Sequence, residues 1–179
     1  MNEQLVQKII AGDQQAFRII VDTYKQPLVS YLMYQTKDEE LAKDIAQETF
    51  IKCYENLEKF KGGSFKAWLF RIAINQLIDF KRKHKEDATP LEETPSLQTP
   101  ETVMLAKEES ALLQQWLGTL DDKTRQIFVL KYASNCSYEE IAETLSIPIT
   151  DVRNRLHRTK TRLRKSKLKG DMNGELLID

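Results

Sequence analysis

Hydrophobic residues recur every three or four positions along most of the chain, which is the spacing of one face of an α-helix. In the first half this pattern predicts four helices, which lie before Gly12, after Asp13, from Lys37 to near Phe60, and from Phe65 to Lys85. Pro27 falls within the second helix and predicts a kink or a restart there. No sustained alternation typical of a β-strand appears, so the sequence predicts an all-α fold.

Residues 86–100 have a different composition. They include three prolines and four acidic residues, with only two large apolar side chains, both leucines. Such a segment cannot bury enough surface to offset the entropy lost on ordering. It predicts a flexible acidic linker between two small helical domains, over 1–85 and 101–169, with a tail over 170–179.

The second domain is predicted to contain two short helices joined by a tight turn. Ser137 and Glu140 have the spacing of a capping box, which starts the first helix. Pro148 ends it, because proline cannot donate to a helix and restricts the residue before it. The next helix begins near Ile149, and 153–169 carries nine basic residues and no acid.

Two helices joined in this way, the second one basic, are typical of a helix-turn-helix that reads the major groove of DNA. A basic helix can equally be a solvated face. The tight turn and the small Ala142, which lets two helices approach closely, favour DNA binding.

Charge is segregated along the chain although it sums to zero, with 27 basic and 27 acidic residues. Residues 1–85 carry a net charge of +3, residues 86–115 a net of −6, and residues 116–179 a net of +3. The neutral total hides two basic lobes separated by an acidic connector, and the sign of each lobe matters more for binding than the sum.

The composition also argues against several classes of protein. Cys53 and Cys136 have no Cys or His companions at the spacing of a disulfide framework or a metal site, so we expect reduced thiols and no metal or cofactor. No apolar run approaches the roughly 18 residues of a membrane span, and no signal peptide is evident, which predicts a soluble cytoplasmic protein. We find no catalytic constellation and expect no enzyme activity.

An acidic face and a glycine-containing loop are the remaining candidate sites. Asp44, Gln47 and Glu48 share one side of a predicted helix, which suits docking on a basic protein surface. From composition alone, a solubilising face is the more frequent explanation. The loop over 61–64 precedes a helix whose cations suit phosphates. Its aromatic rings, Phe65, Trp68 and Phe70, either stack on bases or belong to the core, and for Trp68 the core is the expected place.

Five segments together resemble the extracytoplasmic-function (ECF, group 4) sigma factors of bacterial RNA polymerase. They are residues 44–50 (DIAQETF), 65–75 (FKAWLFRIAIN), 120–128 (LDDKTRQIF), 137–142 (SYEEIA) and 152–158 (VRNRLHR). The resemblance covers about residues 10–168, in the order of the family. It implies a subunit that directs promoter-specific initiation, in response to envelope or environmental stress and under anti-sigma control.

The resemblance also implies roles for individual residues. It implies that core polymerase is bound by Asp44, Gln47 and Glu48. It implies that the −10 element is bound by Lys61, Gly62, Gly63, Ser64, Lys66, Arg71 and Asn75. It implies that the −35 element is bound by Ser137, Arg153, Asn154, Arg155, His157, Arg158 and Arg162.

The implied partners are promoter DNA, an anti-sigma factor, and core RNA polymerase, through the clamp helices of its largest subunit and its flap. The protein is expected in the cytoplasm, either free or held at the membrane by an anti-sigma partner. Residues 150–155 (TDVRNR) depart from the family pattern, and Asp151 would repel a phosphate or prefer a cytosine amine. The alternatives are a helix-turn-helix regulator that acts without being a polymerase subunit and a nucleic-acid enzyme, which the missing catalytic constellation argues against.

Overall fold

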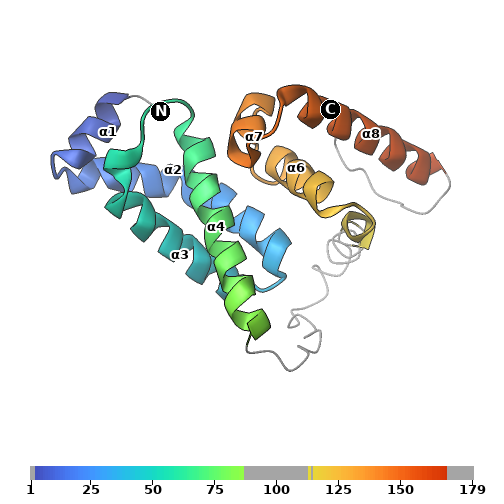
Figure 1. Cartoon of the computed structure of the whole chain (residues 1–179), viewed down its shortest axis with the longest axis horizontal. Helices are drawn as coiled ribbons and strands as arrows, with labels where there is room; N and C mark the ends of the chain where they lie inside the picture. The colour runs from blue at the N-terminus through green and yellow to red at the C-terminus, as the bar shows by residue number, and fades with distance from the viewer. Residues whose placement is uncertain (1–2, 87–112, 114, 169–179) are drawn as a thin grey trace, which may run out of the picture.

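The computed structural model describes residues 3–86, 113 and 115–168. The predicted linker beyond residue 86, residues 101–112 and the tail lie outside these residues. Within the described part the regular elements are all helices, which confirms the predicted all-α fold. Figure 1 shows them in two groups that lie side by side, α1–α4 and α6–α8.

The first domain consists of four α-helices and one short 3₁₀ turn. They are α1 (Glu3–Ile10), α2 (Gln14–Thr36), α3 (Glu39–Glu55), η1 (Leu57–Lys59) and α4 (Phe65–Glu86). Asp13 caps α2 by accepting a hydrogen bond from the Ala16 N–H at 3.1 Å, and Asp38 caps α3 through the Leu41 N–H at 3.1 Å. These starts are those that the sequence predicts.

Two details of the first domain differ from the prediction. The helix α2 continues through Pro27, so of the two predicted outcomes there, a kink or a restart, the restart does not occur. The helix α3 ends at Glu55 rather than near Phe60, where the Asn56 side chain donates to the Lys52 carbonyl oxygen at 2.8 Å. Because Leu57 in the following 3₁₀ turn is also buried, the apolar periodicity hides this break.

The core of the first domain lies between α2, α3 and α4. Leu28 and Leu32 of α2 are fully buried there, as is Leu69 of α4. Tyr31 and Phe70 meet edge to face with 5.7 Å between ring centroids. Full burial of these side chains stabilises the domain, at about 1.5–3 kcal/mol each.

The second domain contains the predicted helix-turn-helix. Its helices are α6 (Asp122–Tyr132), α7 (Tyr138–Leu145) and α8 (Ile149–Leu168). The capping box at the start of α7 is present, with Ser137 Oγ accepting from the Glu140 N–H at 3.0 Å and Glu140 Oε2 accepting from the Ser137 N–H at 2.8 Å. Ser146 takes a left-handed conformation (φ 52°), which ends α7 before Pro148.

The apolar stripe of α8 packs on α6 and α7. Val152, Leu156 and Leu163 are buried, as predicted, and Thr159 joins them. In Figure 1 helix α7 lies beside α4, so the helix-turn-helix also contacts the first domain.

Candidate nucleic-acid and protein-binding surfaces

The acidic face of α3 points away from the core. Asp44, Gln47 and Glu48 are all exposed, whereas Ile45 and Phe50 between and beside them are buried. Glu48 has one cation near it, Lys52, with 3.9 Å between its Oε1 and the lysine Nζ. The three polar side chains therefore lie together on one accessible helix face.

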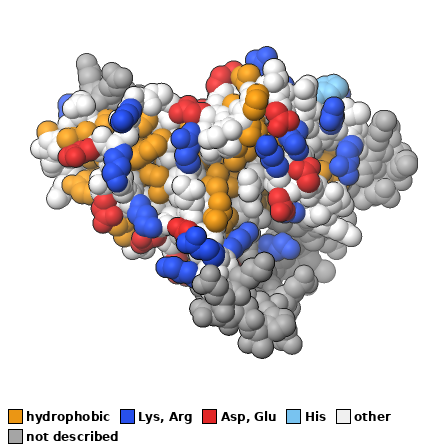
Figure 2. Space-filling view, viewed as in Figure 1, with side chains coloured by type: hydrophobic (Ala, Val, Ile, Leu, Met, Phe, Trp, Pro, Cys, Tyr) orange, Lys and Arg blue, Asp and Glu red, His pale blue; other side chains and the backbone are white. Residues whose placement is uncertain are grey.

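A groove of about 1010 Å³ runs between α2 and α3 next to this face, and Gln47 is part of its lining. Its walls include large hydrophobic side chains that face solvent, among them Met33, Ile51 and Tyr54, which are 40%, 46% and 46% exposed. In Figure 2 hydrophobic side chains show between charged ones on the half formed by α1–α4. The sequence analysis missed this groove, although the apolar Ile51 on a polar helix face was a signal of it.

The glycine-containing loop is in contact with helix α7. The Ser64 N–H donates to Glu143 Oε2 at 3.3 Å, and Ser64 Oγ donates to Glu140 Oε1 at 3.1 Å. Gly62 and Gly63 have positive φ angles of 94° and 87°, and a Cβ on Gly63 would lie 3.1 Å from Glu143 Oε1. Glycine therefore allows both the turn and the close approach of α7.

Two cations that follow the loop also bind the second domain. Lys66 Nζ donates to the carbonyl oxygens of Ser134 at 2.7 Å and Asn135 at 2.8 Å, just beyond the end of α6. Arg71 donates to the carbonyl oxygen of Glu143 near the end of α7. The structure thus brings together Ser64, Lys66 and Arg71, but with their donors bonded to protein oxygens.

Lys61 and Asn75 are exposed at either end of this surface. Asn75 lines a polar hollow of about 290 Å³ between α3, η1 and α4, together with the half-buried Trp68. Phe65 and Phe70, by contrast, are 1% and 0% exposed and have no free ring face. Of the three aromatic side chains that the sequence offered for base stacking, only Trp68 presents part of its ring.

The outer face of α8 carries most of the residues expected at the −35 element. Arg153, Asn154, His157, Arg158 and Arg162 are exposed at positions that repeat along one side of the helix. Figure 2 shows Lys and Arg side chains gathered over α8. This face has the charge and accessibility that the backbone and base edges of DNA require.

Two of the expected −35 residues make contacts within the second domain. The Ser137 hydroxyl is the cap of α7, as described above. Arg155 is half-buried and joins α8 to α6: its Nε donates to Asp151 at 3.0 Å and its Nη1 to Asp121 at 3.2 Å and Thr124 at 2.9 Å. Asp151 is therefore already paired with a cation, four residues along its own helix. Local pattern could not detect the other partner of Arg155, because Asp121 at the cap of α6 is 34 residues away.

Replacing Asp121 with Ala should destabilise the second domain by about 1 kcal/mol at neutral pH, because Asp121 caps α6 through the Thr124 N–H at 3.0 Å. Hydrogen bonds from Thr124, and then the charge of Arg155, lower the pKa of Asp121 below 3.8. Its stabilisation is therefore present above that pH and lost as the pH falls through the lowered pKa. Thermal unfolding at several pH values measures the difference.

Asp122→Ala is the control for this variant, since the neighbouring carboxylate is exposed and does not cap the helix. Its effect should be smaller at neutral pH. A loss from Asp121→Ala that stays the same down to pH 2.5 would contradict the assignment of the cap.

The native thiols should react slowly with Ellman's reagent at pH 8. Burial raises the pKa of Cys53 to about 12 and that of Cys136 to about 11, so both remain protonated, and the thiolate is the reactive form. Unfolding in guanidinium should make both react within the mixing time. Rapid reaction of either thiol in the folded chain would contradict this prediction.

Other kinds of site are not found in residues 3–86 and 115–168. No group of three or more His, Cys, Asp or Glu side chains there is placed to hold a metal ion. None of the helices described is both long enough and apolar enough to span a membrane.

Two helical domains, one ending in a helix-turn-helix with an exposed basic face, are typical of a DNA-binding protein. The comparisons with known proteins narrow this class. Residues 20–86 match the family described as Sigma-70 region 2, and residues 110–163 match Sigma-70, region 4. The chain belongs to the ECF family of RNA polymerase sigma factors.

The sequences of its relatives match this chain along almost their whole length. The ECF RNA polymerase sigma factor SigW of Bacillus subtilis is 36% identical, over 92% of this chain and 96% of the relative. The RNA polymerase sigma-H factor of Pseudomonas aeruginosa is 31% identical, over 92% of this chain and 93% of that protein. Among solved structures, CnrH in complex with the cytosolic domain of CnrY is 26% identical with a TM-score of 0.71, over 93% of this chain and 96% of CnrH.

Proposed function

We propose that this sigma factor docks on core RNA polymerase through Asp44, Gln47 and Glu48 of α3 and directs it to promoters with two DNA-binding surfaces. The observation that carries the proposal is the separation of the two exposed faces, acidic on α3 in one domain and basic on α8 in the other. A negative face suits a basic protein surface and repels DNA, whereas a positive face attracts it. The docking sites are the clamp helices of the largest subunit for the first domain and the flap for the second.

The −10 element is held by the loop 61–64, with Lys66, Arg71 and Asn75. Lysine and arginine supply phosphate contacts, and the glycines let the DNA backbone come close. The hollow lined by Trp68 and Asn75 supports a place for an unstacked base, since it offers an indole edge and an amide.

The −35 element is read by the outer face of α8, with Arg153, Asn154, His157, Arg158 and Arg162. In the major groove, an arginine side chain can form two hydrogen bonds with one guanine, and an asparagine side chain can form two with one adenine. Arg155 positions the helix instead, since its guanidinium is bonded to Asp151, Asp121 and Thr124. Ser137 acts through the cap of α7.

An anti-sigma protein controls this factor, and no catalysis by the chain itself is involved. The support is the likeness to CnrH, whose structure was solved in complex with the cytosolic domain of a second protein, CnrY. The protein then acts in the cytoplasm, either free or held at the membrane by that partner, until envelope or environmental stress releases it.

Pull-down with purified core RNA polymerase tests the docking directly. The chain should form a 1:1 complex with the core enzyme that survives gel filtration. A free helix-turn-helix regulator would instead bind duplex DNA tightly without polymerase and show no complex. Absence of any complex with core enzyme would overturn the proposed function.

A further inference from the structure

The hollow between α3, η1 and α4 has a wall of side chains that are hydrogen-bonded to one another. Lys52 Nζ donates to Gln76 Oε1 at 2.5 Å, which joins α3 to α4. Asn56 donates through Nδ2 to the Lys52 carbonyl oxygen at 2.8 Å and accepts from Lys59 Nζ at 2.6 Å. All four side chains line the hollow, so their polar groups are held in place around it.

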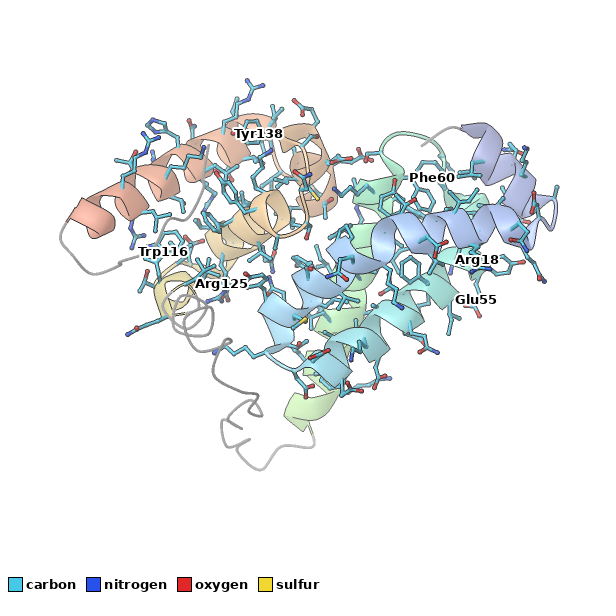
Figure 3. All side chains as sticks on the ribbon, turned by 180° about the vertical axis from the view of Figure 1, so that it is seen from behind. Arg18, Glu55, Phe60, Trp116, Arg125 and Tyr138 are labelled. Carbon is cyan, nitrogen blue, oxygen red and sulfur yellow. The ribbon has the colours of Figure 1, made fainter. Side chains whose placement is uncertain are left out.

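The first domain forms this hollow alone. The residues that α4 contributes repeat at short intervals and lie on its side toward α3: they are Trp68, Ile72, Asn75, Gln76 and Asp79. In Figure 3, Tyr138 at the start of α7 lies to one side of α4, while Phe60, just after η1, lies to the other. The hollow is therefore on a different side of α4 from the contact with α7.

Lys52 determines which end of the Gln76 amide can act on a ligand. A lysine ammonium group has three donors and no acceptor, so the atom that it contacts must be the amide oxygen. Gln76 lines the hollow, and its NH₂ group is the end of the amide that remains to donate to an occupant. Without Lys52 the amide could turn and offer either end.

A donor in a fixed orientation can distinguish one nucleic-acid base from another. The bases carry their acceptor atoms, which are ring nitrogens and carbonyl oxygens, at different places on their edges. A fixed amide donor is therefore satisfied by some bases and not by others, whereas an amide that turns freely can adapt to any of them. Trp68 beside it offers stacking, which depends little on the identity of the base.

We infer that Gln76 is a specificity-determining residue for the −10 element, which donates from its amide to the edge of the unstacked base, and that Lys52 is the positioning residue that keeps this amide in its donor orientation. The inference rests on the proposed function of the hollow as the place of that base. It adds the group that reads the base and the reason why this group is a donor. Its effect is a preference among bases at one position of the −10 element.

Binding of single bases to the full chain tests this inference without polymerase. The probes are five-residue DNA oligonucleotides in which one central base, A, C, G or T, is flanked by abasic residues, so that only one base can enter. Quenching of Trp68 fluorescence reports entry. The measurement uses a Trp116→Phe background, because Trp116 is the other tryptophan of the chain and belongs to the second domain.

The hollow should bind its best base at least about fivefold more tightly than its worst. Gln76→Ala should reduce this ratio to less than about twofold, and so should Lys52→Met. Lys52→Arg keeps a donor for the amide oxygen and should restore the ratio, whereas a purely structural role would lower all four affinities together. Gln15→Ala, at an exposed position of the same domain outside the hollow, is the control and should leave the ratio unchanged.

An unchanged ratio in Gln76→Ala would overturn the role of Gln76, and an unchanged ratio in Lys52→Met would overturn that of Lys52. Failure of all four probes to quench Trp68 would overturn the hollow as a base site and the inference with it, whereas the pull-down with core enzyme tests docking separately. In the holoenzyme, Gln76→Ala should relax the base preference at one position of a randomised −10 element and leave the other positions unchanged. Relaxation at no position would contradict the inference.

Discussion

Reversing the charge of Asp44 and Glu48 together, as Asp44→Lys/Glu48→Lys, should weaken binding to core RNA polymerase by about a hundredfold. The loss of one member of a buried charge pair at an interface costs about 2–5 kcal/mol, and two repulsive lysines would replace two attractive acids. Both side chains are exposed on the α3 face, so the fold should be unchanged. Titration of labelled sigma factor with core enzyme measures the affinity.

Asp22→Lys/Glu58→Lys is the control for this prediction. It makes the same change of net charge at exposed positions of the same domain that lie outside α3. The control should bind core enzyme within about threefold of the unchanged chain, as surface charges away from an interface contribute little. Equal affinity of the two double variants would remove the α3 face as the docking site.

Arg158→Ala should weaken binding of the holoenzyme to the upstream promoter element by about 1–3 kcal/mol if Arg158 makes a bidentate contact with a base. The contrast with Arg155→Ala is the informative part. Arg155 is bonded to Asp151, Asp121 and Thr124, so its removal should mainly lower the melting temperature of the chain. Mobility shifts on promoter duplexes and thermal unfolding separate the two effects.

Two results together would contradict this assignment. Arg158→Ala would leave promoter affinity unchanged, and Arg155→Ala would lower promoter affinity without lowering stability. Arg155 would then be the DNA-reading residue. Arg153→Ala provides a second exposed position on the same face. Loss of affinity for all sequences alike, with a smaller salt dependence, would identify a phosphate contact instead of a base contact.

The helices and most of their starts could be predicted because they depend on neighbouring residues. Asp13, Asp38 and Ser137 each cap the helix that follows within three residues, so the signal is complete in a short window. The end of α3 was predicted wrongly, because Leu57 continues the apolar periodicity beyond the helix end at Asn56.

The contacts between the domains could not be predicted from local pattern. The sequence marked Glu140 as the partner of Ser137, and the structure gives its other carboxylate oxygen to Ser64, 76 residues earlier in the chain. Arg155 likewise counted as a basic residue of a DNA-reading helix until Asp121 appeared beside it. Such pairings depend on how helices and domains pack against one another, which no periodicity encodes.

The exposure of the candidate aromatic residues could not be predicted from local pattern either. Phe65, Trp68 and Phe70 are all base-stacking candidates by their spacing, and the sequence analysis expected Trp68 in the core. Exposure on a helix face depends on packing as well as on spacing. The structure buries Phe65 and Phe70 in the core and leaves part of Trp68 accessible beside Asn75.

In-vitro transcription with purified core RNA polymerase tests the central claim most directly. With a library of genomic fragments as template, the chain should produce discrete transcripts from a small set of promoters that share an upstream and a −10 sequence. Core enzyme with the Asp44→Lys/Glu48→Lys variant should give only background. Transcripts no different from those of core enzyme alone, with the unchanged and folded chain present, would contradict the assignment of this protein as a promoter-specificity subunit.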